Sequence, residues 1–190
     1  MERLEQVLAA IDAANAADPN AEHDSEHSRP AAFLYGQRMS AELARLAPEA
    51  GEALCIAARG QHVERWKLAR TAYPDGRQGY LDWRRAQAAF HAERVAGFMA
   101  EAGYSADEQA RVGTLLRKEG LKRDAEVQML EDVICFVFLR WYFDGFAAGR
   151  DEAHVLRIVS KTARKMSAEG RARVRDEFAL PAPFDQSFAD

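Results

Sequence analysis

Apolar residues recur at the period of an α-helix along almost the whole chain, and this spacing constrains the fold more than any other feature. The first stripe of this kind consists of Leu4, Val7, Leu8 and Ile11. No segment alternates between apolar and polar residues in the way that a half-buried strand does. The sequence therefore predicts an all-α fold, a single-domain helical bundle.

Turn-forming residues divide this pattern into separate helices. The segment TAYPDGRQGY, residues 71–80, is predicted to be a loop because proline, aspartate and glycine favour turns. Pro30 is compatible with a second helix only in its first turn, so residues 25–28 are expected to cap that helix. Further helices are predicted over residues 49–66, 80–102, 106–118, 123–147, 151–166 and 167–178.

Composition excludes several classes of protein. The chain has 190 residues, of which 48% are hydrophobic and 29% charged, as in globular domains rather than disordered chains. Its longest apolar run, residues 133–139, is far below the ~18 residues that a membrane span requires. The N-terminal segment lacks a basic region followed by a long apolar stretch. We therefore expect a cytoplasmic protein with no membrane association.

Charge is unevenly distributed along the chain. The net charge of -4 argues against general nucleic-acid binding. Residues 59–94, however, carry eight Lys and Arg against four Asp and Glu. This segment predicts a small anionic or phosphorylated ligand, because arginine presents planar pairs of donors to phosphate or carboxylate oxygens; a solvated face is the alternative. The candidate anion-binding residues are Arg65, Arg70, Arg77, Arg84, Lys118 and Lys122.

Two histidines and an aspartate are candidate ligands of a metal ion. His27 falls near the inner face of the predicted second helix, and His62 shares the apolar face of the third. Asp132 directly precedes the most apolar run, where an unpaired carboxylate would be costly to bury. The alternatives are hydrogen-bonded core histidines and an N-cap or Arg140 partner for Asp132. If the three side chains converge, their nitrogen and oxygen atoms suit Mn, Fe, Zn, Co or Ni rather than Ca.

The order of His27, His62 and Asp132, with spacings of 35 and 70 residues, resembles the pattern of the HD-domain superfamily of helical metal-dependent phosphohydrolases. His91 falls where some members have an additional histidine. The resemblance implies an HD-like bundle in which these four residues bind a divalent transition metal. The sequence differs from the pattern at Val63, where the superfamily has the aspartate of its His-Asp pair.

Over most of its length the chain resembles a helical family known only as a domain of unknown function. The shared blocks are ARGQHVERW, YPDGRQGYLDWR, FHAERV and LEDVICFVFL. Some members are labelled glutamyl-tRNA synthetase-like, but this chain has neither a parallel-sheet pattern nor an ATP-binding signature. The resemblance divides the chain into an N-terminal helix (1–17), an HD-like core (18–148) and C-terminal helices with a tail packed on the core (149–190).

The sequence leaves two functions open. The first is a metal-dependent phosphohydrolase of a small phosphorylated or nucleotide substrate, in which Glu64 or Glu131 moves the proton and arginines hold the phosphate. The alternative is a non-catalytic helical module that binds an anionic ligand or a protein partner. Val63 after His62 favours this alternative, whereas the clustered histidines favour the hydrolase.

Overall fold

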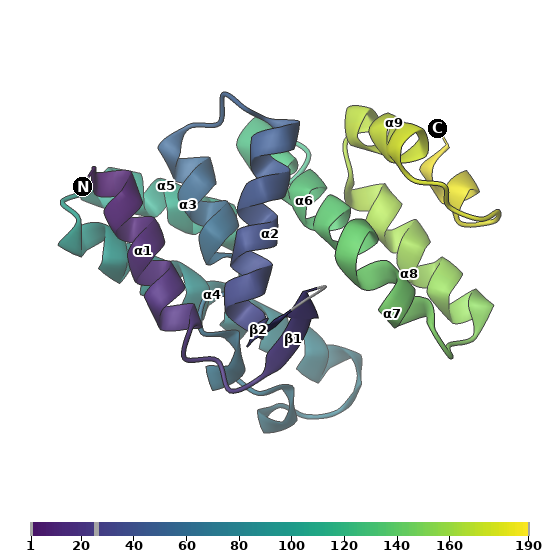
Figure 1. Ribbon diagram of the computed structural model, residues 1–190, viewed down its shortest axis with the longest axis horizontal. Helices are drawn as coiled ribbons and strands as arrows, with labels where there is room; N and C mark the ends of the chain where they lie inside the picture. The colour runs from purple at the N-terminus through teal and green to yellow at the C-terminus, as the bar shows by residue number, and fades with distance from the viewer. Residues whose placement is uncertain (1, 25–26, 190) are drawn as a thin grey trace. The chain divides into compact units, whose positions relative to one another are not determined.

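The described part of the chain is predominantly helical, which confirms the predicted all-α class. A computed structural model describes residues 2–24 and 27–189. The chain forms two compact units, one up to residue 119 and one from residue 120 (Figure 1). Within the described ranges, no helix is both long enough and apolar enough to cross a membrane.

The first unit is a helical bundle with a small hairpin. Its elements are α1 (Arg3–Asn15), β1 (Ala21–Asp24), β2 (His27–Pro30), α2 (Ala31–Leu46), α3 (Glu52–Gly60), the 3₁₀ helices η1 (Arg65–Lys67) and η2 (Arg70–Ala72), α4 (Gly76–Glu101) and α5 (Ala106–Arg117). The long helix α4 packs along α5, and α3 packs against α1, α2 and α5. The centre of this bundle contains Met39, Ile56, Val95 and Leu115, which are fully buried.

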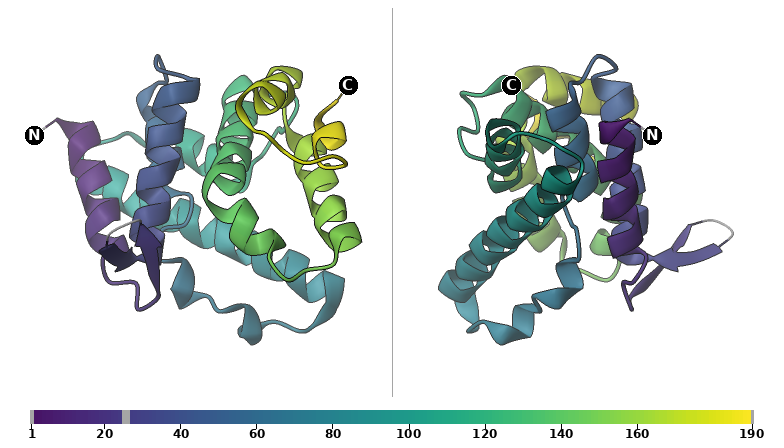
Figure 2. Two further views of the ribbon diagram at one scale, coloured as in Figure 1. Left: turned by 45° about the vertical axis from the view of Figure 1, so that its right-hand side comes forward. Right: turned by 90° about the vertical axis from the view of Figure 1, so that its left-hand side faces the viewer.

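The hairpin replaces the predicted cap of the second helix. Strands β1 and β2 pair antiparallel, with His23 opposite Ser28, and the hairpin extends away from the helices in Figure 2. The residues described in both strands are exposed or half-buried, so no apolar alternation marks them in the sequence. The expectation that residues 25–28 cap a helix is wrong for Ser28, which lies in β2; Ser25 lies outside the described residues.

The second helix begins at Ala31, directly after Pro30. Proline suits this boundary because it lacks the N–H that a helix start cannot satisfy internally. Asp18 supplies a cap from outside the helix, since its carboxylate accepts a hydrogen bond from the Ala32 N–H at 2.9 Å.

The third helix is shorter than predicted and ends at Gly60. A Cβ at this position would lie 2.6 Å from the Val95 side chain, so only glycine permits the close approach of α3 to α4. The chain then turns, and Glu64 adopts a left-handed backbone with φ of 48°. The Glu64 N–H donates to the Asn15 side chain at 2.9 Å. His62 therefore lies in a turn, and its prediction as a residue on the apolar face of a continuous helix over residues 49–66 is wrong.

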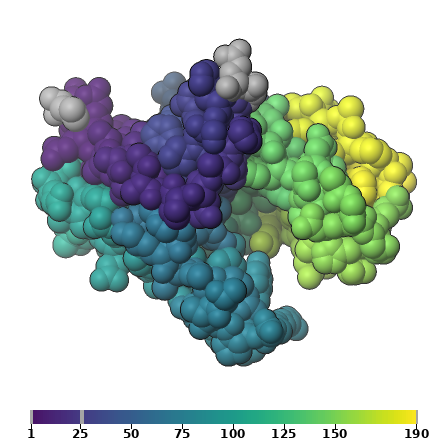
Figure 3. Space-filling view, turned by 60° about the horizontal axis from the view of Figure 1, so that its bottom comes forward, coloured from purple at the N-terminus to yellow at the C-terminus, as the bar shows by residue number. Residues whose placement is uncertain are grey.

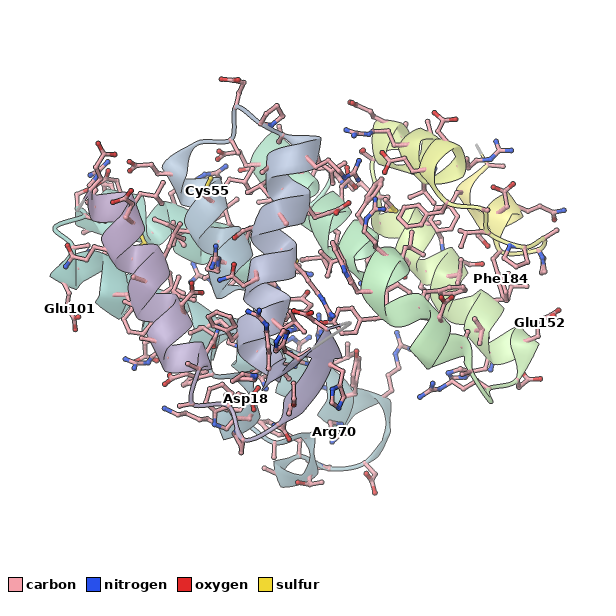
Figure 4. The ribbon with its side chains drawn as sticks, in the orientation of Figure 1. Asp18, Cys55, Arg70, Glu101, Glu152 and Phe184 are labelled. Carbon is pink, nitrogen blue, oxygen red and sulfur yellow. The ribbon has the colours of Figure 1, made fainter. Side chains whose placement is uncertain are left out.

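The loop predicted over residues 71–80 is shorter than expected, because α4 begins at Gly76. Arg70, labelled in Figure 4, donates to two carbonyl oxygens of this loop, one of them that of Pro74. A Cβ at Gly79 would lie 1.9 Å from the Pro74 oxygen, so the loop closes onto α4 only because position 79 is glycine. The blue-teal segment that connects α3 to α4 protrudes from this unit in Figure 3.

The second unit is built around α6, an apolar helix. Its elements are α6 (Ala125–Val137), the π-helical segment η3 (Phe138–Tyr142), α7 (Phe143–Ala147), α8 (Glu152–Lys165), α9 (Ala168–Glu177) and the 3₁₀ helix η4 (Asp185–Phe188). The helix predicted over residues 123–147 thus contains one π-helical segment. Helix α6 packs against α8. The tail is anchored by Phe188, which is buried, and by Phe184, whose ring lies edge-on to Phe143.

Candidate anion-binding site

A pocket of about 210 Å³ opens in the first unit, where the turn after α3 meets α4 and the end of α5. It is smaller than the ~300–1,000 Å³ of most sites for drug-sized ligands. Three segments far apart in the sequence line it, namely Gln61, His62 and Arg65 from the turn, Leu81, Arg84, Arg85, Gln87, Ala88 and His91 from α4, and Leu116, Arg117 and Lys118 from the end of α5.

Two side chains of α4 hold the turn in place. The Trp83 indole N–H donates to the Leu68 carbonyl at 2.9 Å. One turn further along the helix, the Gln87 amide nitrogen donates to the carbonyls of Arg65 and Leu68 at 2.9 and 2.8 Å. The Arg65 guanidinium lies over the Trp83 ring, 4.7 Å from its centroid. These contacts fix the backbone of Arg65 and hold its guanidinium group against the Trp83 ring.

The pocket lining is strongly cationic. It contains five basic side chains and no carboxylate, and these cations are Arg65, Arg84, Arg85, Arg117 and Lys118. Arg85 pairs with Asp82 at 3.1 Å and Arg117 with Glu119 at 2.6 Å, both on the surface. Within the described ranges, neither Arg65 nor Arg84 forms an ion pair with an acidic side chain. Burial, followed by the charge of Arg84, lowers the pKa of Arg65.

His62 and His91 line the same pocket, His62 from the turn after α3 and His91 from α4. The His62 ring stacks on Tyr35 of α2, with centroids 3.8 Å apart and planes inclined by 16°. The centroids of the His62 and His91 rings are 6.2 Å apart. Burial, Arg65 and neighbouring cations lower the pKa of His62 well below its usual value. Burial and then Arg65 lower the pKa of His91 to about 3. Both imidazoles are therefore neutral at physiological pH.

Three residues that line the pocket carry a buried side-chain atom with no hydrogen-bond partner in the described structure. These atoms are Gln61 Oε1, Gln87 Oε1 and His91 Nε2. All three residues are more than nine-tenths buried. Since an unsatisfied buried polar atom costs roughly 1–3 kcal/mol, each of these atoms requires a partner, which an ordered water or a bound molecule supplies.

The carboxylate of Glu64, a predicted catalytic residue, forms structural hydrogen bonds within this unit. Its carboxylate oxygens accept hydrogen bonds from Lys67 and Arg94, each at 2.6 Å. Burial opposes ionisation of Glu64, but the hydrogen bonds from Arg94 and Lys67 outweigh it and lower its pKa. The side chain therefore fixes the turn after α3 to α4.

The other predicted residues of the first unit lie apart from the pocket lining. His27 is on strand β2, where it is exposed, and not on the inner face of a helix as predicted. Arg70 is used by the loop carbonyls described above. Arg77 is exposed in the first turn of α4. The pocket thus brings together His62 and His91 with three of the six predicted anion-binding residues, namely Arg65, Arg84 and Lys118.

Asp132 belongs to the second unit, where it binds Ser167, the N-cap residue of α9. Its carboxylate accepts hydrogen bonds from the Ser167 N–H at 2.9 Å and the Ser167 hydroxyl at 2.5 Å, where α9 begins. Gln128 donates to it at 3.1 Å. Burial raises the pKa of Asp132, and the hydrogen bonds from Ser167 act against that rise. Neither sequence-based alternative applies, because the N-cap of its own helix is Asp124 and Arg140 pairs with Glu177.

Two further predicted residues also have partners within the second unit. The Lys122 ammonium donates to the Met166 carbonyl at 2.6 Å. The Glu131 carboxylate is buried and pairs with Lys165 at 3.5 Å. Both contacts join the region of α6 to the end of α8.

The donors in the pocket do not fit a divalent metal ion. Among residues 2–24 and 27–189, no three His, Cys, Asp or Glu side chains are grouped to hold one. The pocket offers two neutral imidazoles surrounded by five basic side chains, and this charge repels a cation. Val63, which follows His62 in the sequence, is fully buried in the core.

Sequence reasoning missed Gln61 and Gln87 as site residues. Glutamine carries no charge or motif that distinguishes a binding role from a surface one. The available signal for Gln87 was its i, i+4 spacing to both Trp83 and His91, which places all three on one face of α4. Arg85 and Arg117 were also absent from the predicted set, although both line the pocket.

The family model described as "Domain of unknown function (DUF4202)" matches residues 5–186, so the chain belongs to this family. No curated protein and no solved structure matches the chain.

Proposed function

We propose that this member of the DUF4202 family binds a small phosphorylated ligand in the pocket between the turn after α3, α4 and α5. The observation that carries this proposal is the pair Arg65 and Arg84, two guanidinium groups in one small pocket without an acidic partner in the described structure. Their mutual repulsion is relieved when a dianion lies between them. This relief favours the bound state.

The chemistry of the pocket suits a phosphate group. Guanidinium groups donate pairs of parallel hydrogen bonds to phosphate oxygens, and each such charge-assisted bond contributes about 1.5–3 kcal/mol. Lys118 adds a third cation from α5. The neutral histidines contribute ring nitrogens that donate or accept without adding charge.

Metal-dependent hydrolysis of the same ligand is the competing function. The two neutral imidazoles are its support, because metal ions bind the neutral form of histidine. The cationic lining opposes it. We therefore expect Mn²⁺ and a chelator to leave the melting temperature of the protein unchanged. A melting temperature that falls with chelator and recovers with Mn²⁺ would instead favour the hydrolase.

Calorimetric titration with inorganic phosphate at constant ionic strength tests the binding function. We expect the wild type to bind phosphate and Arg84→Met to lose at least about tenfold in affinity, which corresponds to roughly 1.4 kcal/mol. Arg77→Met is the matched control, because Arg77 lies on the same helix outside the pocket lining. The proposal fails if the wild type does not bind phosphate, or if both variants lose the same affinity.

A further inference from the structure

The Gln87 amide has a fixed orientation in the pocket. Its nitrogen uses both hydrogens on the backbone carbonyls of Arg65 and Leu68. The opposite end of the amide is therefore the oxygen, which is buried and has no hydrogen-bond partner in the described structure. Because carbonyl oxygens only accept hydrogen bonds, the molecule that satisfies Gln87 Oε1 must present an O–H or N–H group.

Gln61, at the start of the turn after α3, is a second glutamine in the pocket lining. Its side-chain oxygen is also buried and unpartnered, and the residue is 6% exposed. The dianion of a phosphate monoester cannot satisfy an amide oxygen, because all its oxygens are acceptors. The cationic cluster and the glutamines thus require two different parts of one ligand.

The charge of the pocket restricts the donor to a neutral group. An ammonium group would satisfy an amide oxygen, but five basic side chains surround the pocket and repel it. A hydroxyl group donates one hydrogen bond without adding positive charge. It can also accept from an arginine, which suits its position beside the phosphate.

The size and lining of the pocket favour a ligand smaller than a nucleotide. A volume of about 210 Å³ holds a phosphate and a short carbon chain. The aromatic rings in the lining are those of His62 and His91, and His62 is already covered on one face by Tyr35. The apolar part of the lining is confined to Leu81, Ala88 and Leu116.

We infer that the ligand is a phosphorylated polyol or short sugar phosphate, whose phosphate is bound by Arg65 and Arg84 and whose hydroxyls donate to Gln61 and Gln87. This inference rests on the proposed function, since it specifies the molecule that the phosphate belongs to. A site that hydrogen-bonds a hydroxyl rejects an analogue without it, because the buried acceptor is then left unsatisfied.

Glycerol 1-phosphate and propyl phosphate provide the matched pair of probes, since they differ only in two hydroxyl groups. Calorimetric titration of the wild type should give at least a tenfold tighter dissociation constant for glycerol 1-phosphate. The ratio of the two dissociation constants is compared between variants, because general damage to the pocket weakens the binding of both ligands.

Two variants assign this ratio to the glutamines. In Gln61→Met and Gln87→Met the ratio should fall towards one, while propyl phosphate still binds to Gln61→Met as it does to the wild type. Gln87→Met also removes the bonds to the turn, so its propyl phosphate affinity is expected to fall. Arg77→Met should keep the wild-type ratio.

The outcomes separate this inference from the function on which it rests. Equal affinity of the wild type for both probes overturns the polyol inference and leaves phosphate binding intact. Tighter binding of adenosine 5′-phosphate than of glycerol 1-phosphate also overturns it. If neither probe nor inorganic phosphate binds, the proposed function itself fails.

Discussion

The ring of His62 stacks on the ring of Tyr35, with centroids 3.8 Å apart. This contact joins α2 to the turn after α3 and determines the orientation of the imidazole in the pocket. Aromatic pairs contribute about 0.5–1.5 kcal/mol beyond the area they bury. We therefore expect Tyr35→Leu to lower the free energy of unfolding by at least this amount and to weaken phosphate binding several-fold, as measured by urea unfolding and calorimetry.

Tyr35→Phe separates the ring from the hydroxyl. It retains the aromatic face, so its phosphate affinity should stay near that of the wild type. If Tyr35→Phe weakens binding as much as Tyr35→Leu, the stack does not position His62.

The stability of the first unit should decrease in mild acid. The folded-state pKa of His91 is lowered to about 3, and that of His62 is lowered well below its usual value. Below pH 6.5 the unfolded chain therefore takes up protons that the native protein does not, so the free energy of unfolding falls as the pH falls. Above this range the two histidines no longer lower the free energy of unfolding. Each histidine contributes a slope of up to about 1.4 kcal/mol per pH unit.

Urea unfolding between pH 5.5 and 7.5 measures this slope. His91→Gln should have a shallower dependence than the wild type, because glutamine does not titrate. His154→Gln is the control, since His154 is exposed on α8. An unchanged slope in His91→Gln would show that His91 is not held neutral by the fold.

We expect Asp132 to stabilise the second unit and to have no role in ligand binding. Asp132→Ala leaves the Ser167 N–H without its acceptor and should destabilise the protein by about 1–3 kcal/mol. Asp132→Asn should cost less, because its amide oxygen can accept from that N–H and its nitrogen can donate to the Ser167 hydroxyl. Urea unfolding measures both changes.

Phosphate binding provides the contrasting readout for the same variants. Calorimetry should give both Asp132 variants the wild-type affinity for inorganic phosphate. An Asp132 variant that keeps the wild-type free energy of unfolding but does not bind phosphate would show that Asp132 acts in ligand binding.

The helices were predictable because their apolar residues repeat at the helical period over many turns. The hairpin was not, since its strands are four residues long and polar on both faces. The end of α3 was also missed. Gly60 ends that helix where it packs closely on Val95, a contact between residues 35 positions apart, and the Asn15 side chain then accepts from Glu64.

The candidate site was predictable in its charge but not in its composition. Clustered arginines in residues 59–94 indicated an anion, and Arg65 and Arg84 do line one pocket. Spacing alone could not show that His27 lies on an exposed strand or that Asp132 binds the start of α9. These placements depend on tertiary packing, which a single sequence pattern does not encode.

A crystal structure of the protein with a heavy phosphate mimic such as tungstate tests the central claim most directly. Anomalous scattering locates the anion independently of the protein coordinates. We expect one tungstate with oxygens within roughly 2.7–3.2 Å of the guanidinium groups of both Arg65 and Arg84. A structure in which the bound anion lies elsewhere, with this pocket filled by solvent, would contradict the account.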